Sequence, residues 1–241
     1  TVSPYSELSR WAESDFLRRC SASYCSLGPA PRSTIAASFS SDGELLASTH
    51  GDHTVKLICC RYGKCIRTLA GHRRTPWVVR FHPHNKTLVA SGSLDHEVRL
   101  WNVETGVCTG SWDFGRPIAS LAFHSQGNVL AVASGHKLHI WEHGKGESDS
   151  SAPSICLRTR KSLRAVHFHP HGAPLVLTAE VNDPDQHDYP PSLALTLARA
   201  RQGGDAGQAW EAAYTVTTAA AMGSSSSGAS RTGSGRSAAF M

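Results

Sequence analysis

The chain has 241 residues, of which 40% are hydrophobic and 18% are charged, a composition typical of a globular core with polar flanking segments. No apolar run reaches the roughly 20 residues that span a bilayer, so the sequence predicts no membrane span. The formal net charge is +5, but the basic residues are spread along the chain, and the charge gives little support to a nucleic-acid binder.

Residues 1–30 are predicted to form a helical segment. Ser3 and Pro4 supply an N-cap and a first-turn proline, and no further proline or glycine follows before Cys20. One side of this helix is apolar, although Asp15 and Arg19 intrude, and it carries Tyr5, Leu8, Trp11, Ala12 and Phe16. Such a helix either docks on a partner or covers an open edge of the domain that follows.

A repeat dominates residues 31–197. Each unit has a strand that ends at phenylalanine, a polar turn and an apolar strand, and the phenylalanines are Phe39, Phe81, Phe123 and Phe168. A third strand follows in three units, and a fourth begins in two of them. Four short strands in about 40–45 residues form the blade of a WD40 β-propeller. The sequence therefore predicts an all-β, incomplete propeller with three full blades and one partial blade.

The second unit contains the residues of a polar relay that holds a blade together. His72, Ser91 or Ser93, Asp95 and Trp101 can satisfy one another's buried polar groups. A Ser–His–Asp catalytic triad could also be assembled from them, but no nucleophile turn accompanies the serine. We therefore predict a structural relay and a protein that is not an enzyme.

Other chemical clusters are interpreted as structural. The strings His82-Pro-His84 and His169-Pro-His171 occupy the same turn in two units, so repetition of a turn accounts for them. Seven cysteines without a secretion signal indicate reduced thiols in a cytoplasmic or nuclear protein. The pairs among them lack the matched spacing of a zinc site. No metal site and no cofactor are predicted.

Arg73, Arg74 and Trp77 are the candidate partner-binding residues of the propeller. They are predicted to lie in the connection between the last strand of one blade and the first strand of the next. Arginine and tryptophan are favoured anchors at protein interfaces. The alternative is a solvated loop whose tryptophan packs between two blades.

The pattern fades after the fourth unit. Residues 182–191 are predicted to be a loop because their prolines block strand pairing. Residues 198–241 are rich in glycine, alanine and serine and are predicted to be a disordered tail. The blades before this point do not close a ring, so we expect either further blades from elsewhere or a truncated product.

Several local strings are more specific than a general WD40 repeat. They are Pro31-Arg-Ser-Thr34, Leu45-Leu-Ala-Ser-Thr-His50, Gly71-His-Arg-Arg-Thr-Pro-Trp77, Ile118-Ala-Ser-Leu-Ala-Phe-His124 and Leu177-Thr-Ala-Glu-Val-Asn182. Together, over roughly residues 31–183, they resemble the family of the activating molecule in Beclin-regulated autophagy, including its plant and algal relatives.

The resemblance implies a split propeller whose C-terminal half follows a long insertion. It also implies a substrate receptor of a cullin-RING ubiquitin ligase, with autophagy regulators and ubiquitination substrates as partners. In this family a helix just before the first blade grips the damaged-DNA-binding adaptor, which would make Leu8, Trp11 and Phe16 the anchors in this chain. The alternatives are a generic WD40 scaffold and a nucleic-acid-binding propeller.

Overall fold

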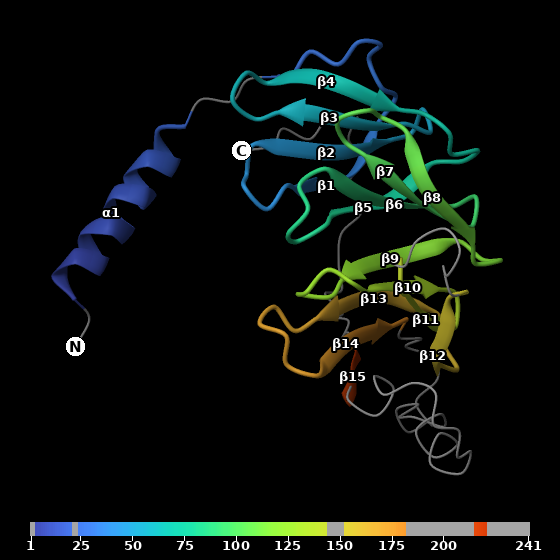
Figure 1. Cartoon of the computed structure of the whole chain (residues 1–241). Helices are drawn as coiled ribbons and strands as arrows, with labels where there is room; N and C mark the ends of the chain where they lie inside the picture. The colour runs from blue at the N-terminus through green and yellow to red at the C-terminus, as the bar shows by residue number, and fades with distance from the viewer. Residues whose placement is uncertain (1–2, 21–23, 144–151, 182–214, 221–241) are drawn as a thin grey trace, which may run out of the picture. The chain divides into compact units, whose positions relative to one another are not determined.

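The computed structural model describes residues 3–20, 24–143, 152–181 and 215–220 (Figure 1). The helix α1 (Pro4–Arg18) belongs to one compact unit, and the strands belong to a second unit. No helix in the described ranges is long and apolar enough to cross a membrane.

Helix α1 begins where the sequence predicts it. Ser3 is the N-cap in an extended conformation, and Pro4 follows it, although the Ser3 side chain makes no capping hydrogen bond. Asp15 and Arg19, which interrupt the apolar side, form an ion pair at 3.2 Å. The helix buries none of its residues.

Three four-stranded antiparallel sheets, ordered as in the chain, form blades 1, 2 and 3. Blade 1 comprises β1 (Thr34–Phe39), β2 (Leu45–His50), β3 (Val55–Cys59) and β4 (Lys64–Leu69). Blade 2 comprises β5 (Pro76–Phe81), β6 (Leu88–Ser93), β7 (Glu97–Asn102) and β8 (Cys108–Asp113). Blade 3 comprises β9 (Ile118–Phe123), β10 (Leu130–Ser134), β11 (Lys137–Trp141) and β12 (Ser154–Arg158).

Blade 4 is a three-stranded sheet of β13 (Leu163–Phe168), β14 (Leu175–Glu180) and β15 (Thr215–Ala220). Strand β15 pairs with β14 in parallel, whereas the third strand of each other blade is antiparallel to the second. The predicted loop 182–191 lies outside the described residues. Of the predicted tail, only β15 is described, and its Thr-Val-Thr-Thr sequence favours a strand.

The core lies between successive blades. The first strands β1, β5, β9 and β13 are neighbours in this order, as the drawing shows for the stacked sheets (Figure 1). Three buried apolar clusters fill the spaces between blades 1 and 2, blades 2 and 3, and blades 3 and 4. Each blade therefore buries both of its faces only where a blade precedes it and another follows it. The prediction of an incomplete WD40 propeller with three full blades and one partial blade is confirmed.

Candidate partner-binding surfaces and the blade relay

The structure brings the predicted relay residues of blade 2 together. His72 Nδ1 lies 3.0 Å from Asp95 Oδ2, and His72 Nε2 lies 2.7 Å from Ser91 Oγ. Trp101 Nε1 donates to the same Ser91 hydroxyl at 2.8 Å. Of the two predicted serines, Ser91 is the relay member, while Ser93 instead donates to the Arg74 carbonyl at 2.9 Å.

The charges of the relay follow from its surroundings. Burial lowers the pKa of His72 by more than the adjacent Asp95 raises it, so the imidazole is neutral. Burial alone would raise the pKa of Asp95, but backbone N–H groups of Glu97 and Arg73 bind its carboxylate, and the pKa is lowered. A neutral imidazole that donates from Nδ1 to Asp95 must accept at Nε2 from the Ser91 hydroxyl. Every hydrogen-bonding group of the relay then has a partner.

The distances in this relay also match those of a Ser–His–Asp triad, but its burial argues for a structural role. Ser91 and its neighbour Ser93 have no exposed surface, and His72 and Trp101 are buried as well. The Ser91 oxygen already accepts the indole N–H. A serine in this position cannot meet a substrate, and its hydrogen bonds are all used within the blade.

Blade 1 uses a different histidine for the same purpose. His50, on strand β2, lies with Nε2 2.8 Å from Ser48 Oγ and with Nδ1 3.3 Å from Thr34 Oγ1. Ile58 stands where blade 2 has Trp101, so no indole joins the network. Blade 1 therefore has a histidine–serine pair, although it lacks the Gly-His dipeptide that blade 2 has at Gly71-His72. Sequence reasoning missed His50 because a histidine inside a strand carries no motif.

The candidate partner-binding residues Arg73, Arg74 and Trp77, which we call the rim, differ in their surroundings. Arg73 is tied to the relay, because its backbone N–H donates to Asp95 Oδ2 at 2.8 Å and its side chain lies 3.8 Å from Glu97 Oε1. Arg74 is exposed in the same connection. No bond to its guanidinium is found among the described residues.

The prediction that Trp77 lies in this connection is wrong. Trp77 belongs to strand β5, at the β-bulge between Pro76 and Val78. A bulge turns a side chain away from the regular alternation of the strand. Trp77 is 48% exposed, so it is not buried between two blades.

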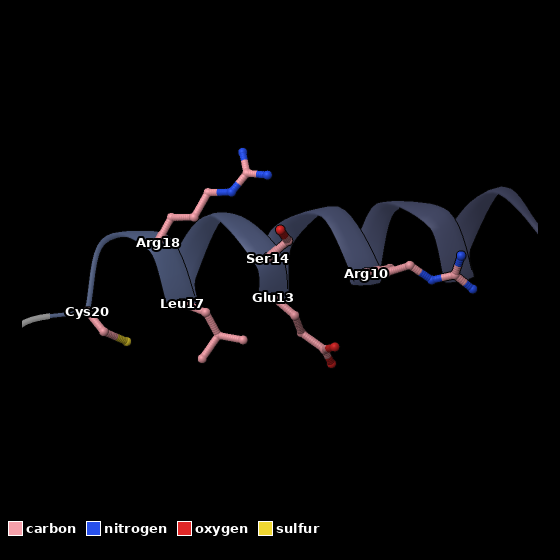
Figure 2. Close-up of a pocket in the computed structure, with 6 residues that line it drawn as sticks. All are labelled: Arg10, Glu13, Ser14, Leu17, Arg18 and Cys20. Carbon is pink, nitrogen blue, oxygen red and sulfur yellow. The ribbon is translucent and has the colours of Figure 1, made fainter. Parts of the chain in front are cut away.

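Helix α1 presents the three proposed anchors to solvent. Leu8, Trp11 and Phe16 are 61%, 66% and 71% exposed. A surface hollow on the helix is lined by Arg10, Glu13, Ser14, Leu17, Arg18 and Cys20 (Figure 2). At 3.6 residues per turn these side chains lie on the side of the helix opposite to Leu8 and Phe16. The hollow is therefore separate from Leu8 and Phe16, whereas Trp11 borders it, because Ser14 and Arg18 follow Trp11 by three and seven residues on the same side of the helix.

Among the described residues, no group of three or more histidine, cysteine or acidic side chains could hold a metal ion. The cysteines in this part of the chain form no disulfide. The relay and the rim, rather than a metal centre, are thus the polar features that the fold positions.

Comparison with known proteins agrees with this architecture. The model of the "WD domain, G-beta repeat" family matches residues 26–58, 63–102 and 106–142. The activating molecule in BECN1-regulated autophagy protein 1B of Danio rerio is 42% identical over 158 residues, which are 66% of this chain and 11% of that protein. Protein 1A of the same organism is 39% identical over 170 residues, 70% of this chain and 13% of that protein.

Two further similarities are more distant. Subunit I of eukaryotic translation initiation factor 3 from Aspergillus fumigatus is 40% identical over 105 residues, 42% of this chain and 30% of that protein. A chain in the crystal structure of the mitotic checkpoint complex superimposes with a TM-score of 0.50 at 22% identity, covering 58% of this chain and 44% of that chain. This last similarity supports the fold only.

The chain spans only about a tenth of the length of the two autophagy relatives. Its three matched repeats cover β1 to β3, β4 to β7 and β8 to β11, so the second and third each begin with the last strand of the preceding blade. This chain is therefore a WD40-repeat protein, and across its blades it is similar to the activating molecule in Beclin-regulated autophagy.

Proposed function

We propose that this chain is a non-catalytic WD40 interaction scaffold in autophagy regulation, and that it serves as a substrate receptor of a cullin-RING ubiquitin ligase. The observation that carries the proposal is the 42% identity of its blades to the autophagy relative. In this proposal the protein works in the cytoplasm and the nucleus, and helix α1 docks on the damaged-DNA-binding adaptor of the ligase.

The state of helix α1 supports the docking role. Large aromatic and aliphatic side chains dominate helix-in-groove interfaces, because they remove the most apolar surface from water. Leu8, Trp11 and Phe16 are all more than 60% exposed, and the helix buries no residue of its own. A partner that covers these side chains would remove this apolar surface from water.

The helix offers its own matched control. Trp11→Ala together with Phe16→Ala should weaken capture of the adaptor about thirtyfold or more, since truncating one buried aromatic commonly costs about 2 kcal/mol. Leu17→Ala removes a side chain of similar exposure, 67%, from the other side of the helix and should leave capture unchanged. Binding of the full chain to the purified adaptor, measured by calorimetry, gives both values. Equal affinities for the two variants would assign docking to the propeller instead.

The rim beside blade 2 is the proposed surface for acidic segments of regulators or substrates. Arg74 is exposed, Arg73 lies at 3.8 Å from Glu97, and Trp77 adds an exposed indole. A guanidinium can hold a carboxylate with two parallel hydrogen bonds. Reversing Arg74 to Glu should therefore abolish binding of a polyglutamate probe peptide, while Arg61→Glu, an exposed arginine in the turn between β3 and β4, should not. Unchanged binding in both variants would make Arg74 a solvated residue.

A further inference from the structure

Each of the four blades carries a basic residue two positions before its first strand. These residues are Arg32, Arg74, Arg116 and Lys161, which precede β1, β5, β9 and β13 in this order. They recur with the period of the blades, so the fold places them at equivalent positions. We call these four residues the basic row.

The backbone around the basic row is held in the same way from blade to blade. In three blades the carbonyl of the residue after the basic one accepts a backbone N–H from just beyond the second strand. The pairs are Ser33 with Gly51 at 3.0 Å, Thr75 with Leu94 at 3.1 Å and Ser162 with Val181 at 2.9 Å. In blade 3 the hydroxyl of Ser134 donates to the carbonyl of Arg116 at 3.0 Å, as the hydroxyl of Ser93 donates to that of Arg74 at 2.9 Å.

The basic row lies at one end of the blades. Strands β1, β5, β9 and β13 are neighbours in this order. The start of β13 contacts the turn between the second and third strands of blade 3, because Leu163 donates its N–H to the carbonyl of Gly135 at 2.7 Å. The start of β9 lies in the same way against the end of β6, since a Cβ on Gly92 would collide with Ile118. The row therefore crosses from blade to blade at the end where the first strands begin.

The charges of the basic row are available to a ligand. Arg32, Arg74 and Arg116 are exposed and Lys161 is half-buried, and no ion pair to any of the four is found in the described ranges. Acidic residues at this end are held inside the blades instead. Their contacts are Asp52 with the Thr54 hydroxyl at 2.6 Å, Asp95 with His72 at 3.0 Å and Glu97 with Arg99 at 2.7 Å. Charges of one sign that are not neutralised attract a ligand of the opposite sign.

Histidines occupy the turns beside the basic row. His53, His96 and His136 lie between the second and third strands of blades 1, 2 and 3. His53 and His96 have φ angles of 68° and 77°, a conformation that glycine adopts without strain and other residues rarely adopt. Backbone angles of this kind cluster at functional positions. The carbonyls of His96 and His136 accept backbone N–H groups of the connections that lead to the next blade, at 3.0 and 2.9 Å.

The spacing of the basic row selects the shape of its ligand. Apolar clusters fill the spaces between successive blades, and packed sheets lie about 10 Å apart. A polyproline II helix has three residues per turn and rises about 3.1 Å per residue, so every third side chain lies on the same side, about 9 Å from the last. Its backbone makes no internal hydrogen bonds, and its carbonyls stay free to accept imidazole N–H groups.

We propose that the basic row binds an acidic segment of a partner protein in the polyproline II conformation, with a carboxylate at every third residue and one carboxylate for each blade. His53, His96 and His136 donate to the backbone of the segment. This inference rests on the binding of acidic segments proposed for the rim, and it extends that site from blade 2 to all four blades. The surface thus recognises the spacing of the charges as well as their sign.

Two peptides of equal composition and charge test the spacing. One has four Glu-Pro-Pro units, and the other has four glutamates followed by eight prolines. Fluorescence anisotropy with the full chain should give a Kd about fivefold or more lower for the first peptide, because only this peptide can place one carboxylate at each blade. Equal affinities would overturn the proposal. A twelve-residue oligothymidylate that binds more tightly than either peptide at the same salt concentration would also overturn it, in favour of nucleic acid.

Charge reversal tests the blades beyond the rim. Arg116→Glu with Lys161→Glu should weaken binding of the Glu-Pro-Pro peptide about tenfold or more, since two carboxylates of the ligand then face like charges. The matched control is Arg61→Glu with Lys64→Glu, which changes the net charge equally at two exposed residues of the turn between β3 and β4 and of β4. The control should change the Kd less than about twofold.

Replacing the strained histidines separates binding from stability. His53→Gly with His96→Gly removes two imidazoles and relieves the unfavourable φ angles, so the Tm should stay the same or rise. Binding of the Glu-Pro-Pro peptide should nevertheless weaken about threefold or more. Unchanged binding would overturn the role of the two histidines. Circular dichroism verifies that every variant is folded.

The failure of this inference is distinct from the failure of the proposed function. Binding that is lost with Arg74→Glu but kept with Arg116→Glu and Lys161→Glu would confine the site to the rim, which overturns the basic row and leaves the proposed function in place. Adaptor capture through Trp11 is measured separately and does not depend on any member of the row.

Discussion

Phe114 lies against Trp141 in blade 3 as His72 lies against Trp101 in blade 2. The ring centroids are 6.3 Å apart at 68° in the first pair and 6.1 Å apart at 67° in the second. Val132 takes the place of the relay serine, since each faces the same position of the third strand. The same space within a blade is therefore filled by a polar relay in one case and by apolar side chains in the other.

Loss of the central hydroxyl should destabilise the domain. Ser91→Ala leaves the N–H of Trp101 and the Nε2 of His72 buried without a partner, which we expect to lower the free energy of unfolding by about 2 kcal/mol. Ser111→Ala, at an exposed serine on β8, should change it by less than about 0.5 kcal/mol. Urea denaturation measures both variants. Similar midpoints would show that the relay contributes little to stability.

In blade 3, where Phe114 and Val132 replace the polar relay, we expect two substitutions to have coupled effects on stability. Phe114→His places an imidazole where Val132 offers no acceptor, so it should cost about 1–3 kcal/mol of stability. Adding Val132→Ser supplies a hydroxyl next to the new ring and should recover part of this loss. A double-mutant cycle of unfolding free energies gives the coupling. Additive effects would mean that the two positions do not meet.

The natural presence of Phe114 and Val132 in blade 3, where blade 2 has His72 and Ser91, also shows the limit of prediction from sequence. The relay of blade 2 was predicted because its residue types match a known signature at known spacing. Phe114 was not predicted to take the place of His72, since a motif search finds identical residues and cannot see that another aromatic ring packs against the tryptophan in a similar way. His50 was missed because it lies on strand β2, two residues after the serine that it contacts, and a histidine at this place matches no motif.

Strand boundaries and exposure were less predictable than the repeat itself. The position of Trp77 on β5 depends on a bulge, and a bulge adds one residue without leaving a composition signal. Strand β12 was not predicted, because its short Ser-Ile-Cys-Leu-Arg sequence gains its place from pairing with β11. Strand β15 depends on a parallel contact with β14 across a long stretch of sequence, and no local pattern encodes such a contact.

Acid should weaken blade 3 through His139. This side chain is buried, its Nε2 has no hydrogen-bond partner in the described part of the chain, and burial, with Lys137 and Arg158 nearby, lowers its pKa to about 4. The unfolded chain binds the proton near pH 6.5. The stability contribution is thus complete above pH 6.5 and is lost as the pH falls toward 4, by up to about 3 kcal/mol.

Burial lowers the pKa of other histidines as well, so acid destabilises the chain through them too. The contribution of His139 is therefore obtained by comparing the unaltered chain with a variant that lacks this histidine. The unfolding free energy of the unaltered chain should fall relative to that of His139→Leu as the pH goes from 7 to 4, because only the unaltered chain has to protonate a buried imidazole. Parallel curves would show that His139 does not titrate in this range.

Lys56 should be replaceable without loss of stability. Its side chain has no exposed surface, its ammonium makes no hydrogen bond within the described residues, and Asp52 Oδ2 lies 3.7 Å away. Replacing a buried charge by an apolar side chain of similar volume is often neutral or stabilising, whereas removing only its counter-charge is costly. We expect Lys56→Met to keep or raise the Tm and Asp52→Asn to lower it. A Tm lowered by Lys56→Met would show that the ion pair stabilises blade 1.

The parallel pairing of β15 with β14 restricts how blade 4 can be edited. Two antiparallel strands can be joined by a two-residue turn, but a parallel neighbour has to start again from the end where the first strand began. The six residues of β14 extend over about 20 Å, so the connection between 180 and 215 must cover at least this distance. Shortening it to a tight turn would force Thr215–Ala220 either to leave the sheet or to reverse its direction. The length of this connection is thus a topological requirement of the fourth blade, whatever its sequence.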